Sequence, residues 1–219
     1  MGAESLEVDR LLSLLHEANN RTKAVVWTGW SMFFPFNPKE IRPRVRVSSI
    51  ANAEKEFLES DLTMEGGGYL DFWRFSTDGL ATLIRGYRED SGNSRRAYQE
   101  GLVPGACLSP IALAQDVTEF ISHAIAMAEI LDVQSIELRF SWVGLKDRKI
   151  AEFSWQDRID PHVSVTDSRQ VTKVIERVAA KAELPKLVAE TINPVLRLFD
   201  GLQVDENWIR NQMQKFKQL

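Results

Sequence analysis

The chain has 219 residues, of which 44% are hydrophobic and 26% are charged. These fractions are typical of a folded globular protein, and they exclude a disordered, collagen-like or coiled-coil chain. The formal net charge of -4 excludes a surface that is basic throughout, so any phosphate contact must come from a local patch. The single cysteine, Cys107, cannot form an internal disulfide, which fits a reducing cytoplasm.

The N-terminal region does not have the pattern of a targeting or membrane segment. Charged residues occur throughout the first twenty positions, which argues against a signal peptide. The longest mostly apolar stretch, residues 24–36, is shorter than the roughly 20 residues that a membrane-spanning helix needs. We therefore expect a cytoplasmic protein that does not span a membrane.

The first fifty residues predict one helix and an aromatic segment. Apolar residues at helical spacing predict a helix over residues 6–18, with Ser5 as its N-cap and an Asn pair, residues 19–20, at its end. Residues 25–36 are rich in Trp and Phe and are interpreted as core, with an interface as the alternative. For the charged stretch over residues 51–62, a helix is the first interpretation.

A β-hairpin is the clearest element of the first half. Residues 69–75 and 80–87 are rich in strand-forming side chains, and the turn between them, residues 76–79, ends in Asp-Gly. The polar segment that follows, residues 88–105, predicts a mobile loop.

The second half begins with a long helix and a strand. Apolar residues recur on one helical face over residues 111–131, and Ser109 followed by Pro is a typical helix start. Residues 136–142 alternate between apolar and polar side chains, which predicts a strand with one buried face. Residues 149–155 are expected to pair back onto that strand.

The C-terminal third predicts one more strand and two helices. Residues 163–165 begin a strand, and residues 171–178 fit either a strand or a helix. A strand that forms a hairpin with residues 163–165 is favoured, because β-branched residues dominate. A helix that begins at Pro185 should kink at Pro194, and Asp205 can cap a final helix.

Together these elements predict the α+β class. We expect a single domain over residues 1–219, with residues 1–105 and 106–219 as possible sub-parts. Antiparallel hairpins would pack against the long central helix, and further helices would lie at the N and C termini.

The hairpin carries the most informative group of side chains. Aromatic and cationic residues on one sheet can recognise a base, a peptide or an anion. Alternation along the strand puts Trp73 and Phe75 on one face, and Phe72 and Arg74 on the other. Cross-strand packing with surface ion pairs is the alternative interpretation. The candidate ligand-binding residues are Trp73, Arg74, Arg85, Tyr87 and Arg88.

A second basic element is formed by Arg42, Arg44 and Arg46, which occupy alternate positions. Such a run can contact phosphates and is the candidate nucleic-acid-binding element. A charged edge strand that resists aggregation explains the same pattern.

Motifs for catalysis, cofactors and metals were not found. The sequence lacks a glycine-rich phosphate loop that ends in Lys-Ser or Lys-Thr. No histidine pair has the spacing of a metal site, so we expect no metal and no cofactor. His16 is expected to be solvated, His123 to lie on the surface or a secondary helix face, and Cys107 to be a small buried hydrophobic residue.

Three segments together resemble a known family. Residues 71–79 (DFWRFSTDG), 84–91 (IRGYREDS) and 138–148 (LRFSWVGLKDR) are similar to the C-terminal region of bacterial Schlafen-like, AlbA-type DNA-binding proteins, which are often labelled ATP-binding. The resemblance covers residues 6–216. It implies that nucleic-acid or nucleotide binding belongs to an N-terminal AlbA-type domain, which is not found in this sequence. The chain would then be the accessory C-terminal half.

These observations favour a non-enzymatic accessory or regulatory binding domain. It would sense a ligand or a protein partner for a transcription-control or phage-defence protein. The partner is a separate protein or an attached N-terminal effector domain, a small-molecule ligand and self-association stay open, and nucleic acid is not expected to bind this chain alone.

Two alternative functions stay open. One is a nucleotide-binding protein or small hydrolase whose site is assembled only in three dimensions, with His123, Glu89, Asp90 and Arg139 as its participants. The other is weak nucleic-acid binding through the arginine element.

Overall fold

The structure is a computed structural model, and it describes most of the chain. The described residues are 7–26, 32–33, 43–50, 53–63, 70–90, 104–150 and 163–216. The helices are α1 (Val8–Lys23), α3 (Pro110–Ile130), α4 (Arg177–Ala182), α5 (Leu184–Leu196) and α6 (Glu206–Phe216), with a 3-10 turn η1 (Arg88–Asp90). The strands are β1 (Arg44–Ile50), β2 (Ala53–Thr63), β3 (Leu70–Ser76), β4 (Ala81–Arg85), β5 (Cys107–Leu108), β6 (Ser135–Trp142), β7 (Lys149–Ile150) and β8 (Arg169–Glu176).

The larger sheet is antiparallel, with the strand order β1-β2-β3-β4. The predicted hairpin is confirmed as β3 and β4. Its turn needs Gly79, which has a φ of 88° that favours glycine. The helix expected over residues 51–62 is wrong, because this stretch forms β2 and pairs with β1 on one side and β3 on the other. The strand places Leu58 on its inner face, among apolar groups.

The second sheet differs from the predicted pairing. Strand β6 pairs with β8 along its full length, not with residues 149–155. The returning segment contributes β7, which pairs in parallel with β5; the residues after Ile150 lie outside the described part. Val163 makes a single bridge to Lys149, so the predicted hairpin between residues 163–165 and 171–178 is also wrong. The strand predicted over residues 171–178 is itself confirmed as β8, which ends at Glu176.

The helix ends follow the predicted caps in part. Helix α1 continues beyond the predicted stop to Lys23, and Ser5 lies outside the described residues. Helix α3 is capped by Ser109, whose Oγ accepts a hydrogen bond from the Ala112 amide. Asp205 caps α6 by accepting from the Trp208 amide at 2.7 Å.

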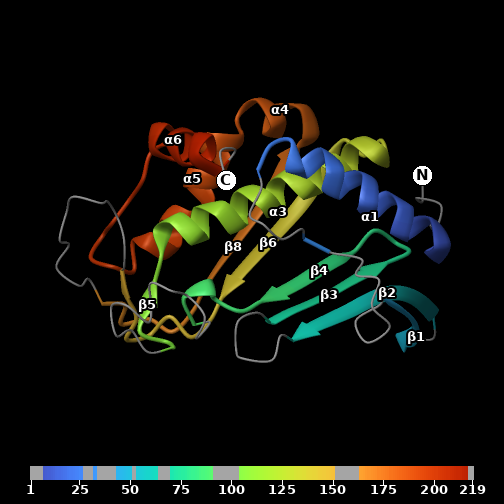
Figure 1. Ribbon diagram of the computed structural model, residues 1–219, viewed down its shortest axis with the longest axis horizontal. Helices are drawn as coiled ribbons and strands as arrows, with labels where there is room; N and C mark the ends of the chain where they lie inside the picture. The colour runs from blue at the N-terminus through green and yellow to red at the C-terminus, as the bar shows by residue number, and fades with distance from the viewer. Residues whose placement is uncertain are drawn as a thin grey trace.

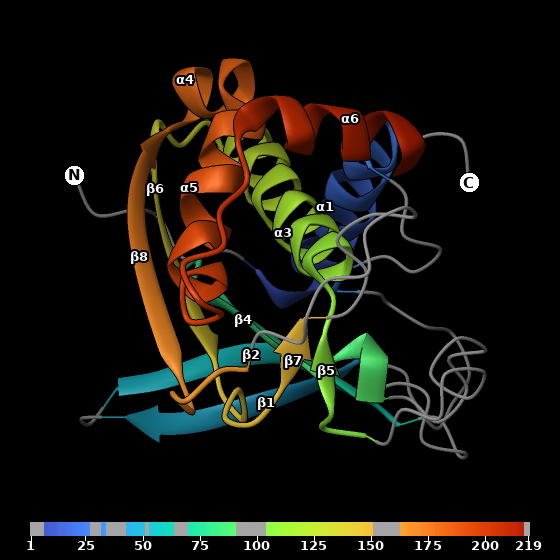
Figure 2. The same cartoon turned by 90° about the vertical axis from the view of Figure 1, so that its left-hand side faces the viewer.

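Helix α3 lies at the centre of the fold, as predicted (Figure 1). The four-stranded sheet lies along the bottom of the molecule, and the β6–β8 pair stands at its side, so that α3 and α5 lie in the angle between them (Figure 2). One buried cluster joins α1, the inner face of the sheet and α3, and the other joins α3, α5, α6 and the β6–β8 pair. No described helix is long and apolar enough to cross a membrane.

Candidate functional site

The hairpin strands separate the predicted site residues onto two faces of the sheet. Asp71, Trp73 and Phe75 are buried on the face toward the helices, while Arg74 is partly exposed on the other face, as the alternation predicted. The strand register sets Arg85 opposite Asp71, so Arg85 also lies on the inner face. The five predicted ligand-binding residues therefore do not form one surface.

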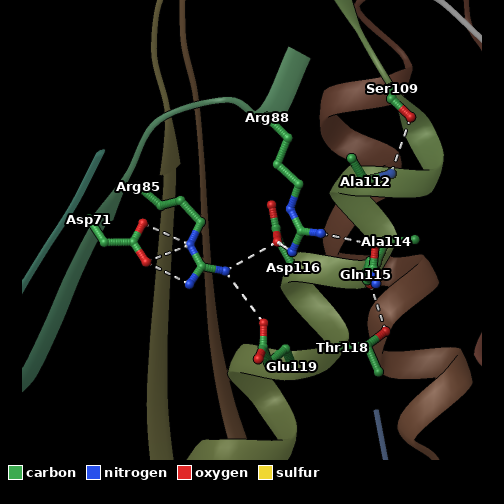
Figure 3. Close-up of polar contacts among 10 residues, drawn as sticks. All are labelled: Asp71, Arg85, Arg88, Ser109, Ala112, Ala114, Gln115, Asp116, Thr118 and Glu119. Carbon is green, nitrogen blue, oxygen red and sulfur yellow. Dashed lines mark hydrogen bonds and ion pairs between the residues drawn. The ribbon is translucent and has the colours of Figure 1, made fainter. Parts of the chain in front are cut away.

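Arg85 lies between the sheet and α3 (Figure 3). Its Nε and Nη2 donate to the two carboxylate oxygens of Asp71 at 3.0 and 2.8 Å, and its side chain is 8% exposed. Its Nη1 lies 3.3 Å from Asp116 and 3.4 Å from Glu119, both on α3. Burial would lower the pKa of Arg85, but Asp116, Asp71 and Glu119 outweigh burial and hold the pKa above its ordinary value.

The η1 turn attaches the hairpin to the N-terminal half of α3. Arg88 donates to Asp116 and to Gln115 on α3. Glu89 accepts from the Ser109 amide at the start of α3. Burial raises the pKa of Glu89 to about 7, and the nearby Asp116 adds to the effect.

Arg148 completes this arrangement from the turn after β6. It donates to both oxygens of Asp90 at 2.8 and 2.5 Å and to the backbone oxygens of Cys107 and Gly144 at 2.7 Å each. Its guanidinium stacks on the Tyr87 ring, 4.2 Å from the centroid. The Tyr87 hydroxyl donates to the Val143 oxygen at 2.9 Å, and burial raises the pKa of this hydroxyl to about 12.

We call this set of residues the buried junction. Its arginines all have carboxylate partners, and its carboxylates outnumber its arginines by five to three among the described residues. It connects the four-stranded sheet to the start of α3 and to the turn after β6. Its ion pairs and hydrogen bonds therefore hold parts of the same chain together. The junction residues are Asp71, Arg85, Arg88, Glu89, Asp90, Asp116, Glu119 and Arg148.

Trp73 lies in the core. Its side chain is 3% exposed and makes an edge-to-face contact with Phe33, with ring centroids 6.1 Å apart. A ligand could reach this ring only by displacing core side chains. Trp73 thus contributes to the packing of the core, and its ring is not accessible for the ligand-binding role predicted for it.

The other face of the sheet brings the two predicted basic elements together. Arg74 donates from Nε and Nη2 to Glu59 Oε2 at 3.0 and 2.7 Å, and Arg46 donates from Nε to Glu59 Oε1 at 3.1 Å. Burial would raise the pKa of Glu59, but the two arginines hold it below its ordinary value. Arg44 pairs with Asp61 on the same face, and Arg42 lies outside the described residues.

Apolar side chains adjoin these arginines. The Arg74 guanidinium lies 4.9 Å from the Phe57 ring centroid and 5.7 Å from that of Phe72. Leu70 is 53% exposed and Ile84 is 57% exposed. All described helices lie on the opposite side of the sheet (Figures 1 and 2). We call this surface the outer face, and it comprises Arg44, Arg46, Phe57, Glu59, Asp61, Leu70, Phe72, Arg74 and Ile84.

The four residues of the alternative enzymatic site lie in different surroundings. Of the two positions predicted for His123, the surface is wrong, because the residue is 2% exposed. Its ring packs at a tilt against Phe33, with ring centroids 4.9 Å apart. Burial lowers its pKa to about 3. Arg139 is exposed and pairs with Glu137. Among the described contacts, none joins His123 or Arg139 to Glu89 or Asp90, and the described residues hold no group of His, Cys, Asp or Glu arranged for a metal ion.

Sequence reasoning missed the carboxylates that organise both faces. Asp116 and Glu119 have (i, i+3) spacing beside the apolar stripe of α3, which indicates that both point to one side of the helix. Glu59 went unnoticed because its segment was interpreted as helical. Arg148 stands inside one of the segments that carry the family resemblance, although no role was assigned to it.

No family model, curated protein or solved structure matches this chain. The family resemblance therefore stays a prediction. All three segments that carry it contribute to the buried junction: residues 71–79 supply Asp71, residues 84–91 supply Arg85 and Glu89, and residues 138–148 supply Arg148.

Proposed function

We propose that this chain is a non-enzymatic recognition domain that binds a partner protein through the outer face. The observation that carries the proposal is the combination of exposed apolar and cationic side chains on a sheet face that no described helix covers. Ile84 and Leu70 supply exposed apolar area on the same face of the sheet that carries Arg74. Aromatic and arginine side chains are the types enriched in protein interfaces.

The arrangement of the other polar residues supports binding over catalysis. The junction arginines are already held by carboxylates of the same chain, and Arg85 is closed off from solvent. His123 lies in the core, and among the described contacts none joins its ring to a carboxylate that could take part in an acid–base mechanism. The outer face retains accessible charge beside accessible apolar surface.

The partner in this proposal is a separate protein or an attached effector domain. A regulatory role in transcription control or phage defence follows from the family resemblance and is part of the same proposal. Binding would then transmit the presence of the partner to the effector, and turnover of a substrate would not be needed.

Selection from a library of random peptides tests the proposal without knowledge of the natural partner. The full chain is the bait, and the enriched peptides are measured against Ile84→Lys, which puts a charge in the apolar part of the outer face. The matched control is Val174→Lys, because Val174 is similarly exposed but lies on β8. We expect enriched peptides to lose affinity for Ile84→Lys and to bind Val174→Lys as well as the parent chain.

Three results would overturn the proposal. One is a failure to enrich any peptide, and another is equal affinity for both variants. The third is hydrolysis of a nucleotide by the purified chain at a rate that a junction variant abolishes, which would establish the enzymatic alternative.

A further inference from the structure

We infer that Arg46 and Arg74, fixed by Glu59, form a binding site for a carboxylate of an acidic partner polypeptide. The inference rests on the proposed recognition function, and it names the chemical class of the partner and the residues that select it. Its basis is the geometry of one carboxylate shared by two arginines on an exposed surface.

Both arginines keep hydrogen-bond donors that Glu59 does not use. Arg46 reaches Glu59 through Nε alone, so its two terminal nitrogens make no hydrogen bond among the described contacts. Arg74 uses Nε and Nη2, which leaves Nη1. Because the two guanidiniums bind the two oxygens of one carboxylate, both are held on the same face of the sheet, and we infer that their remaining donors can reach a second anion.

Glu59 holds Arg46 and Arg74 in place and is more buried than either arginine. Its side chain is 11% exposed, whereas those of Arg46 and Arg74 are 55% and 43% exposed. The Arg74 guanidinium also packs against the rings of Phe57 and Phe72. The arginines are therefore held in place before any ligand arrives, which reduces the entropy that binding must overcome.

The charges of the cluster favour an anion. Two guanidiniums on one carboxylate leave one positive charge, and the neighbouring pair Arg44 and Asp61 is neutral. The buried junction has the opposite imbalance, since its carboxylates are in excess. An anion that approaches this acidic chain would meet its attractive site on the outer face.

The surroundings favour a polypeptide as the source of the anion. Phe72 lies beside Arg74, and Ile84 is opposite Phe72 in the register of β3 and β4. An acidic side chain with an apolar neighbour would satisfy both features at once. A nucleic-acid backbone would need a longer run of cations than Arg46 and Arg74 supply, and the neighbouring Arg44–Asp61 pair adds no net positive charge.

Fluorescence anisotropy of a labelled peptide tests the inference. The probe is a short peptide with Glu residues on both sides of one Phe, compared with the same peptide bearing Gln in place of Glu. We expect the full chain to bind the Glu peptide, and the double variant Arg46→Gln/Arg74→Gln to bind it about tenfold more weakly or worse. Arg139→Gln, which removes an exposed arginine from β6, should bind like the parent chain.

A second double variant, Arg46→Lys/Arg74→Lys, separates geometry from charge. Lysine keeps the charge but cannot present the planar set of donors, so we expect it to bind as weakly as the Gln variant. Unchanged binding by the Lys variant would overturn the assigned geometry. Thermal unfolding of each variant shows that it is folded.

The remaining outcomes separate this inference from the proposed function. If the Glu peptide binds and the Gln variant keeps full affinity, the carboxylate site is overturned while recognition stands. If neither this peptide nor the random library yields binding, both proposals fail. If a phosphopeptide or a single-stranded oligonucleotide binds through Arg46 and Arg74 and the Glu peptide does not, the carboxylate assignment is overturned.

Discussion

Arg74 and Arg85 lie on adjacent strands of one hairpin, yet they have different environments. Arg85 faces the helices and is 8% exposed, with carboxylates on both sides of it. Arg74 faces away from the helices, is 43% exposed and has one carboxylate partner. The comparison teaches that the face of the sheet, more than the residue type, decides whether an arginine holds the fold together or is available to a ligand.

The two environments also differ in free energy. Removing one member of a buried ion pair leaves an uncompensated charge in a medium that solvates it poorly. An exposed pair loses little when it is broken, because water and salt replace the partner. The same substitution should therefore give very different losses of stability on the two faces.

The largest expected effect is that of Arg85→Met. It leaves Asp71 and Glu119 buried without their cation, and we expect the free energy of unfolding to fall by about 3 to 5 kcal/mol. Arg74→Met, the matched change on the outer face, should cost about 1 kcal/mol or less. Urea denaturation of both variants at neutral pH measures the difference.

Asp71→Asn gives a further control for this comparison. Arg85 would still have Asp116 and Glu119, so the loss of stability should be smaller than in Arg85→Met. Equal losses in Arg85→Met and Arg74→Met would contradict the contrast between the two faces.

The second prediction tests the excess of carboxylates in the junction. Burial raises the pKa of Glu89 from 4.5 to about 7, so the folded chain binds more protons than the unfolded chain between these values. Stability contributed by Glu89 is therefore present at low pH and is lost as the pH rises toward 7. Glu89→Gln keeps an acceptor for the Ser109 amide, and at pH 8 it should be more stable than the parent chain by up to about 3 kcal/mol.

Asp90 is the matched control, because it belongs to the same turn. Burial would raise the pKa of Asp90, but its contacts with Arg148 and the Gly105 amide lower it. Asp90→Asn should therefore destabilise the protein at pH 8, opposite to Glu89→Gln. Thermal unfolding at pH 5 and pH 8 measures both, and a loss of stability in Glu89→Gln at pH 8 would rule out a buried, proton-carrying Glu89.

Local patterns in the sequence predicted part of this arrangement. The Asp-Gly turn and the alternation in residues 70–76 specified the hairpin and the separation of Trp73 from Arg74. They did not show the junction, because Arg85 becomes an internal group only when α3 supplies Asp116 and Glu119. Such contacts join residues far apart in the chain, and their positions depend on how the helix crosses the sheet.

Strand pairing was the least predictable feature of the second half. Alternation identified residues 136–142 as a strand, and the abundance of β-branched residues favoured a strand over residues 171–178, but neither signal carries information on which strands are neighbours. The chain connects β6 to β8 across a long segment, whereas the prediction used the nearest candidate, residues 149–155. On the outer face, the role of Glu59 similarly required the register of β2 between β1 and β3.

The third prediction extends the comparison of buried and exposed groups to the histidines. His16 is exposed on α1, whereas burial lowers the pKa of His123 from 6.5 to about 3. Below pH 6.5 the unfolded chain takes up a proton that the folded chain does not, so stability falls as the pH falls. Between pH 7 and pH 5 the contribution of His123 alone should be a loss of about 2 kcal/mol, and His123→Met should remove this contribution while His16→Gln leaves it intact.

The contributions of His123 and Glu89 have opposite signs between pH 4.5 and 6.5, so the parent chain should show a nearly flat stability profile there. Each single variant should then expose the slope of the other group: stability should fall with rising pH in His123→Met and rise with it in Glu89→Gln. Thermal unfolding across this range measures all three profiles. Parallel profiles for the parent chain and both variants would show that neither group carries the protonation state that its burial imposes.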